Sequence, residues 1–365
     1  MSIKNFRHKW IFGVLIALIL LVLCFYDLDF SKLWQTVKKI RVFLLLPAFA
    51  FGLTKVFCAS LRWKMIIDLR KKIPVRRIFS VYSVGQMVNI SLPALTGQAA
   101  RVLILNKAEK LPKTFCATTI LLEATFDGIC LMLLLVISSF FFKFPDWITR
   151  YVFILAIVLI ALIGAYVLIL INRRGLTYFG KTKIRRKFPR LYKRIENFAK
   201  SFTSALSILT SLKHILLIFG ISVLMWCCSL GVIMSVIAAF DVAFGLDVPY
   251  WMGLVFVAIT AFFTTIPITP GNVGTFQWIV IGLLKQFYGG EMPKEVAVGF
   301  SIILHFLNLI PVWTWGLLFL FIDHFGVSEI RKESMASEFP EQNGCENGHS
   351  DGDQDSIEVD EIKHS

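Results

Sequence analysis

The sequence predicts an all-α polytopic membrane protein with about six full spans and two opposed re-entrant helical hairpins in an inverted repeat. Composition is the first observation: 56% of the 365 residues are hydrophobic and the mean hydropathy is +0.71, well beyond a soluble domain. The second is a set of continuous apolar runs close to the roughly 20 residues that a helix needs to cross the hydrocarbon. The third is the placement of basic loops between these runs, which sets their orientation.

Six apolar runs have the length expected of spans, and continuous runs of this kind cross a bilayer as helices rather than as a barrel. They cover residues 10–26, 42–61, 115–142, 151–171, 214–240 and 295–322. The first run resembles a signal peptide, but no small-residue cleavage site follows it, so we expect a retained anchor. Two further stretches, 78–105 and 251–288, are apolar but interrupted at their centres by Pro, Gly and polar residues.

Basic loops decide how the two interrupted stretches enter the membrane. Residues 173–200 carry eleven Lys and Arg against one acid, and residues 62–77 carry seven basic residues, so both segments are expected in the cytoplasm. The two full spans between them already return the chain to that side, and residues 78–105 must therefore enter and leave from the cytoplasm. By the same parity, residues 251–288 dip in from the outer face. Ordinary kinked spans are the alternative.

The centres of the two stretches share a Pro-x-x-x-Gly pattern. Pro93 and Gly97 carry it in the first stretch, and Pro270 and Gly274 carry it in the second. Because a full span lies on each side of each stretch, the pattern suits an inverted repeat of broken helices, the plan of many secondary transporters. Non-helical backbone at membrane depth needs protein, water or ligand to satisfy its polar groups, which implies a cavity.

Each hairpin is expected to restart a helix near its glycine. The first N–H groups of such a helix are unpaired and lie at the positive end of the macrodipole. The two restarts could therefore cradle an anionic group such as a lipid phosphate. Thr96, Thr269 and Asn272 can alternatively serve only as helix caps.

Charged residues within the apolar runs are the other indication of a site, since each ionised group near the bilayer centre costs on the order of 2.5–3.5 kcal/mol or more. Glu123 and Asp127 are four residues apart and share one helix face, and Arg101 lies on the second arm of the first hairpin. We expect Arg101 to pair with one or both carboxylates, either as a structural salt bridge or as part of a headgroup-binding or gating site. Lys55 and His305 are weaker candidates, because Lys55 can snorkel and His305 can be a satisfied interior histidine.

Three segments resemble motifs of the lysylphosphatidylglycerol synthase transmembrane-region family, a flippase-like group of membrane proteins. Residues 89–101 are similar to its Leu-Pro-Gly-Arg-x-Gly-Glu-x-x-Arg stretch, Glu123 and Asp127 to its Glu-Arg-x-x-Asp, and residues 270–277 to its Pro-Gly-Gly-x-Gly-x-x-Glu. The likeness covers about residues 8–325.

The chain also departs from the family pattern. The family usually has Gly, Arg, Gly and Glu at the positions of Ala94, Ala124, Asn272 and Gln277. In full synthases of the family, a cytosolic aminoacyl-transferase domain follows the membrane region. The resemblance therefore implies a stand-alone lipid translocase without that domain.

We expect the substrate site to combine the tip residues with the buried charges. The set is Pro93, Thr96, Gly97, Arg101, Glu123, Asp127, Pro270, Gly271, Asn272, Gly274 and Gln277. No catalytic residue, metal ligand or cofactor is expected, because the seven cysteines lack zinc-ligand spacing and the sequence shows no nucleotide loop, metalloprotease helix or nucleophile elbow.

The predicted function is lipid translocation by a flippase-like protein that binds a polar or anionic lipid headgroup at the hairpin tips. Two alternatives stay open: a membrane glycosyl- or acyltransferase acting on a lipid-linked substrate, and a non-transporting membrane scaffold. The expected partners are membrane lipids and not nucleic acid. A homo-oligomer and a partner for the acidic tail are both compatible with the sequence.

Charge divides the chain into two parts. Residues 1–332, the predicted flippase-like transmembrane domain, carry 37 Lys and Arg against 14 Asp and Glu, a net charge of +23. Residues 333–365 carry ten acids and one lysine, a net charge of −9, and we expect a disordered cytoplasmic tail. We expect a multi-pass protein of a bacterial or archaeal plasma (inner) membrane, and the basic loops predict that both termini are cytoplasmic.

Overall fold

The structure, a computed structural model, describes residues 15–91, 96–144, 146–171, 211–265, 269–288 and 292–323. All regular secondary structure in these residues is helical, which confirms the all-α class. Four helical segments are long and apolar enough to cross a membrane. They are Val42–Ile67, which joins η1 (Val42–Leu45) to α3 (Leu46–Ile67), α6 (Lys113–Ser139), α11 (Leu212–Phe244) and α14 (Lys294–Ile322). The predicted acidic tail and the basic segment 173–200 lie outside the described residues.

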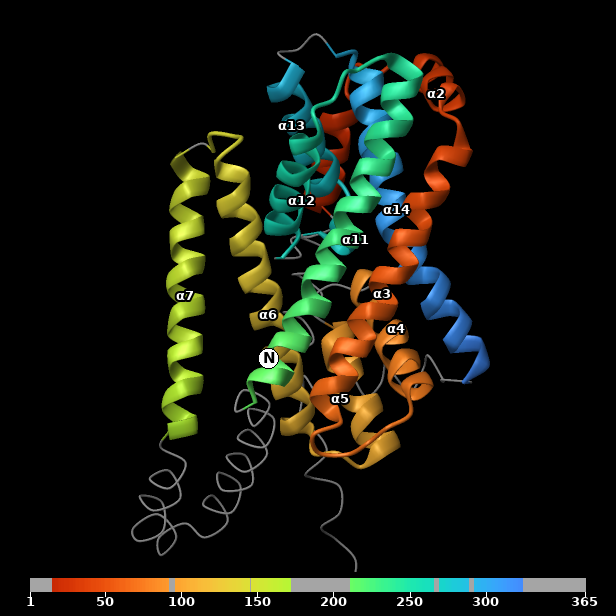
Figure 1. Ribbon diagram of the computed structural model, residues 1–365. Coiled ribbons are helices and arrows are strands. Elements are labelled where there is room, and N and C mark those ends of the chain that lie inside the picture. The colour runs from red at the N-terminus through yellow and green to blue at the C-terminus, as the bar shows by residue number, and fades with distance from the viewer. Residues whose placement is uncertain are drawn as a thin grey trace, which may run out of the picture.

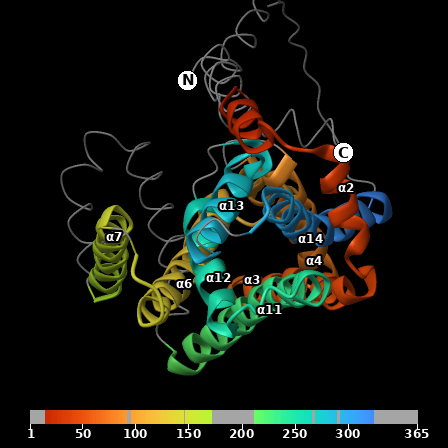
Figure 2. The same ribbon diagram turned by 90° about the horizontal axis from the view of Figure 1, so that it is seen from above.

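The other two predicted spans are also helical where the structure describes them. They form the helix Leu15–Phe25 and α7 (Asp146–Ile171). α7 stands at one side of the bundle next to α6 (Figures 1 and 2). Between the first helix and η1 lies the short helix α2 (Phe30–Lys39), whose N-cap Asp29 accepts hydrogen bonds from the N–H groups of Ser31 and Lys32. The bond from Lys32, followed by that from Ser31, holds the pKa of the Asp29 carboxyl below its usual value.

The first interrupted stretch forms two short antiparallel helices, α4 (Val75–Ser91) and α5 (Thr96–Glu109). Their 17 and 14 residues give lengths of about 25 and 21 Å, less than the roughly 30 Å of a hydrocarbon core. Lys71, just before α4, forms a 2.7 Å ion pair with Glu109 at the end of α5. The pair therefore begins and ends at the same end of the molecule, the lower half in Figure 1.

The second interrupted stretch forms a matching pair in the upper half of Figure 1. It consists of α12 (Tyr250–Thr264), the short helix η3 (Pro270–Asn272) and α13 (Thr275–Tyr288). The hydroxyl of Tyr288 donates to the carbonyl of Leu246 at 3.2 Å, which ties the end of α13 to the segment before α12. The two helix pairs thus enter the bundle from opposite ends.

α3 and α11 lie side by side (Figure 2) and run in opposite directions (Figure 1). Small residues allow close approach here and elsewhere: a Cβ on Gly231 of α11 would lie 2.7 Å from the ring of Phe51, and one on Gly52 would lie 2.5 Å from Pro311 within α14. Small residues at such contacts are typical of helix packing in lipid, where van der Waals contact drives association.

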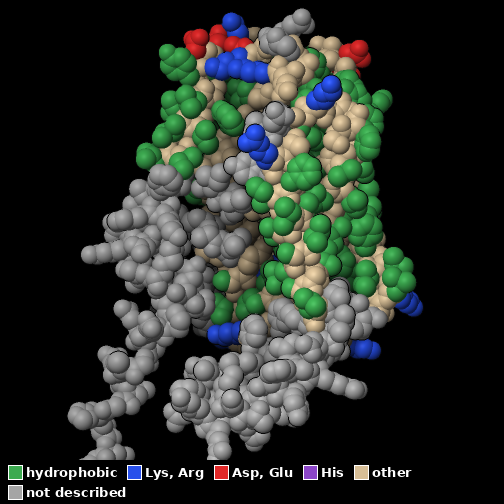
Figure 3. Space-filling view, turned by 90° about the vertical axis from the view of Figure 1, so that its left-hand side faces the viewer, with side chains coloured by type: hydrophobic (Ala, Val, Ile, Leu, Met, Phe, Trp, Pro, Cys, Tyr) green, Lys and Arg blue, Asp and Glu red, His purple; other side chains and the backbone are tan. Residues whose placement is uncertain are grey.

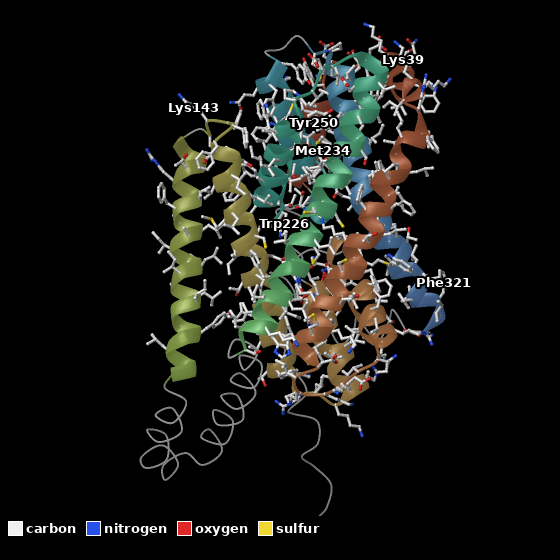
Figure 4. The ribbon with its side chains drawn as sticks, viewed as in Figure 1. Lys39, Lys143, Trp226, Met234, Tyr250 and Phe321 are labelled. Atoms are coloured by element: carbon white, nitrogen blue, oxygen red, sulfur yellow. The ribbon has the colours of Figure 1, made fainter. Side chains whose placement is uncertain are left out.

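The outer surface fits a lipid environment. Hydrophobic side chains cover the length of the described helices, and most of the described charged side chains on the face shown lie toward its two ends (Figure 3). Lys39, Lys143 and the 85% exposed Tyr250 lie toward the upper end, and the 73% exposed Phe321 lies in the lower half, at the end of α14 (Figure 4). Aromatic and basic residues at the ends of apolar helices are typical of membrane–water interfaces.

Candidate functional site

Arg101 of α5 is almost fully buried, at 2% exposure, and pairs with Glu123 of α6. Its Nη2 donates to Glu123 Oε2, and its Nη1 donates to Gln98 Oε1 at 3.2 Å. The guanidinium lies 4.0 Å from the ring centroid of Trp63 and 4.5 Å from that of Tyr82. These cation–π contacts and the ion pair fasten α5 to α3, α4 and α6.

Asp127, the second carboxylate, pairs with Arg62 and not with Arg101. Arg62 donates from Nη1 to Asp127 Oδ1 at 2.5 Å and from Nη2 to Oδ2 at 2.8 Å, a bidentate arrangement. Nη1 also donates to Ser222 of α11 at 3.0 Å, and Nη2 lies 3.7 Å from Glu123 Oε1. The four charged side chains of Arg62, Arg101, Glu123 and Asp127 form one network, called here the ion-pair network.

The position of Arg62 corrects the sequence analysis, which placed it at the start of a cytoplasmic loop. α3 continues to Ile67, and Arg62 is 1% exposed within it. The apolar residues Trp63, Ile66 and Ile67 were the signal, because they extend the buried face of the helix beyond the charge. The predicted span 42–61 ended six residues before the end of α3 at Ile67.

The ion-pair network is uneven in its exposure. The side chains of Arg62, Arg101 and Glu123 are at most 5% exposed, whereas that of Asp127 is 40% exposed in the middle of α6. Among the described residues, no hydrogen-bond partner reaches Arg62 Nε, Arg101 Nε or Glu123 Oε1. Burying charged groups whose hydrogen bonds are not all made is costly.

The tip of the second helix pair has an unusual backbone. Gly271, Asn272 and Gly274 have φ values of +59°, +56° and +81°, the left-handed region that glycine and, less often, asparagine adopt. A Cβ on Gly271 would lie 3.0 Å from the carbonyl oxygen of Ile90, at the end of α4. The tips of the two helix pairs therefore meet inside the bundle.

A closed set of hydrogen bonds holds this second tip. The N–H of Gly274 donates to Gln277 Oε1 at 2.8 Å. Gln277 is the third residue of α13, and a side chain at this position often caps the N-terminus of its helix. Gln277 Nε2 lies 2.8 Å from His305 Nδ1, and His305 Nε2 lies 3.0 Å from the Gly271 carbonyl. Because that carbonyl can only accept, Nε2 carries the proton and Nδ1 accepts from Gln277. Phe276 stacks on the imidazole at 4.7 Å.

These contacts show what the predicted tip residues do. Gln277 caps α13 and orients His305, which matches the expectation of a satisfied interior histidine. Gly97 packs directly on α4, since a Cβ there would lie 2.2 Å from the carbonyl oxygen of Gly85. Thr96 is 6% exposed, and neither its hydroxyl nor Asn272 Oδ1 has a hydrogen-bond partner among the described residues. Pro93 lies outside the described residues.

The predicted set therefore falls into two neighbouring polar regions. The ion-pair network gathers Arg101, Glu123 and Asp127, while the tips gather Thr96, Pro270 and the residues that follow it. Arg101 is five residues into α5 from Thr96, about 7.5 Å along the helix axis. The sequence analysis did not predict that Arg62 and Ser222 bond within the ion-pair network, or that His305 bonds to the second tip.

These observations define the class of protein. It is a multi-pass α-helical membrane protein with two opposed helix pairs that meet inside the bundle. The chain belongs to the lysylphosphatidylglycerol synthase TM region family, whose sequence model matches residues 10–316. This match includes every residue of the ion-pair network and of both tips, and it confirms the resemblance noted from the motifs. A comparison with curated proteins finds no match.

Proposed function

We propose that this protein is a lipid translocase that binds a polar or anionic headgroup where the two helix-pair tips meet. The observation that carries the proposal is two buried polar atoms, the Thr96 hydroxyl and Asn272 Oδ1, that have no hydrogen-bond partner among the described residues. A hydroxyl can donate to a phosphate oxygen and an amide oxygen can accept from a headgroup hydroxyl or ammonium group. Buried polar atoms without partners are rare in proteins, and a ligand that supplies the bonds accounts for them.

The proposed topology makes the two helix pairs re-entrant hairpins. α4 and α5 would enter from the cytoplasm, flanked by α3 and α6, and α12 and α13 would enter from outside, flanked by α11 and α14. Support comes from their short lengths, from their opposed entry ends and from the parity of the basic loops. Such an inverted repeat would open the tips alternately to each side.

The ion-pair network would couple headgroup binding to movement of the first hairpin. Both carboxylates are held by guanidinium groups, Glu123 by Arg101 and Asp127 by Arg62, which supports an electrostatic role for them. A lipid phosphate can replace a carboxylate as the partner of a guanidinium, since both accept bidentate bonds. Exchange of this kind would loosen α5 from α6 while keeping each buried cation paired.

The test is Thr96→Val, which keeps the side-chain shape and removes the hydroxyl. A hydrogen bond to a charged group contributes about 1.5–3 kcal/mol, so transfer of a fluorescent anionic phospholipid between vesicle leaflets should fall about tenfold or more. The fold should be unaffected, because the hydroxyl has no described protein partner. Reconstituted vesicles and a dithionite quenching assay give the rate, and thermal unfolding checks the fold.

Thr118→Val is the matched control. Its hydroxyl bonds to the Thr114 carbonyl of its own helix at 2.8 Å, away from both tips. This variant should transfer lipid at the wild-type rate. Wild-type transfer by the Thr96→Val protein would refute the assignment of the tips as the headgroup site.

A further inference from the structure

Lys55 is a charged residue inside the bundle that the ion-pair network does not include. It is the tenth of 22 residues of α3 and is half-buried. Ala59, Arg62 and Ile66 follow it at spacings of four, seven and eleven, so they share its helix face, and all three are at most 2% exposed. Lys55 therefore faces the protein and does not snorkel along a lipid-facing surface.

The depth of Lys55 can be found from contacts of the neighbouring helices. Trp315 of α14 donates to the carbonyl of Leu53 at 3.3 Å, and the next residue, Gly316, lies against Met87 of α4. Lys55 is two residues, about 3 Å, beyond Leu53. It thus lies near the level of Met87, one turn before the end of α4, where the two tips meet.

The electrostatic surroundings of Lys55 are incomplete. No hydrogen bond or ion pair joins its Nζ to any part of the chain that the structure describes. Among the described residues, Asp127 and Cys228 act electrostatically on Lys55, and Asp127 is already held at both oxygens by Arg62. With Lys55 added, the charged side chains of this region are three cations and two carboxylates, and an uncompensated charge at such depth is costly.

We propose that Lys55 binds the phosphate of a lipid headgroup on the side of α3 that faces α11, beside the exposed carboxylate of Asp127. The lipid would supply the anion that the region lacks, and its acyl chains would stay in the surrounding hydrocarbon. This inference rests on the proposed function, because the lipid that binds at the tips is the source of the phosphate.

The experiment compares Lys55→Met with Lys55→Arg in the purified full-length chain. Two fluorescent lipids with the same acyl chains serve as probes, phosphatidylglycerol and a glucosyl-diacylglycerol that has no phosphate. Lys55→Met should raise the Kd for phosphatidylglycerol about tenfold, because it removes one charge-assisted hydrogen bond. Lys55→Arg keeps such a bond and should hold the Kd within about threefold of the wild-type value. Both variants should bind the phosphate-free lipid as the wild type does.

Lys285→Met is the control, since this lysine lies on an exposed position of α13. Unchanged phosphatidylglycerol binding by Lys55→Met, or an equal loss of both lipids, would overturn the inference. Displacement of the labelled lipid by inorganic phosphate alone would show a free-anion site and would overturn the lipid assignment.

Lipid transfer separates this inference from the proposed function. If Lys55→Met loses phosphatidylglycerol binding but the wild type moves no lipid across vesicles, the phosphate site stands and the translocase fails. If the wild type moves lipid and Lys55→Met binds and moves it equally well, the translocase stands and the phosphate site fails.

Discussion

Removing Asp127 should destabilise the protein more than removing Arg62 does, although the two side chains form one ion pair. Asp127→Asn leaves the guanidinium of Arg62, 1% exposed, with Ser222 at 3.0 Å and Glu123 at 3.7 Å as its partners. Arg62→Met leaves a carboxylate that is 40% exposed and that the cavity expected at the tips would hydrate, while Glu123 keeps Arg101. The two variants differ in stability because Asp127→Asn leaves a buried cation without its partner, whereas Arg62→Met leaves a partly exposed carboxylate without its partner.

The expected magnitudes follow from this difference. Removing one partner of a buried pair costs about 3–5 kcal/mol, and Asp127→Asn should fall toward that range. Arg62→Met should cost about 1–2 kcal/mol if water in the expected cavity reaches Asp127, because a hydrated charge loses little when its partner is removed. The double variant strands neither charge, so its loss should be smaller than the sum of the single losses by about 1–3 kcal/mol.

Unfolding of the purified protein in mixed micelles, titrated with dodecyl sulfate and followed by far-ultraviolet circular dichroism, measures these differences. Asp68→Asn is the control, since its pair with Lys64 lies at the end of α3 with side chains 30% and 18% exposed and should be worth about 0.3–0.5 kcal/mol. A loss for Arg62→Met equal to or above that for Asp127→Asn would refute the reasoning, as would strict additivity in the double variant.

Two further predictions concern packing and topology. Gly97→Ala should destabilise the protein by about 1–3 kcal/mol in the same titration, because its Cβ would lie 2.2 Å from the Gly85 carbonyl oxygen. Gly220→Ala is the control and should be neutral or stabilising, since nothing lies within 4 Å of its Cβ. Equal effects of the two variants would contradict the close helix contact. Single cysteines replacing Lys72 and Lys113, which flank α4 and α5, should both react with an impermeant maleimide only from the cytoplasm, and a cysteine replacing Tyr250 only from outside. Labelling of the first two positions from opposite faces would favour the kinked-span alternative.

Much of the candidate site was predictable because its signals are local. The interruption predicted around Pro93 and Gly97 corresponds to the end of α4 at Ser91 and the start of α5 at Thr96, and the one at Pro270 to Gly274 lies between α12 and α13. The pairing of Arg101 with Glu123 followed from the cost of unpaired charge in an apolar run, and it is present. Whether these residues bind a lipid stays a prediction.

Other parts of the site involve residues far apart along the chain. Arg62 and Ser222 are 160 residues apart, and their bond depends on the antiparallel packing of α3 on α11. Gln277 and His305 interact because α13 and α14 lie together, and neither residue type predicts that partner.

The sequence by itself determined the membrane class, the apolar helices, the two interruptions and the expected orientation, because hydropathy and backbone preference act within one segment. Only the tertiary structure decided that the tips meet at Gly271 and Ile90, that Asp127 pairs with Arg62, and that Lys55 faces inward. The physical reason is that a side chain's partner depends on which faces of separate helices are opposed, and that choice is made by packing over the whole bundle.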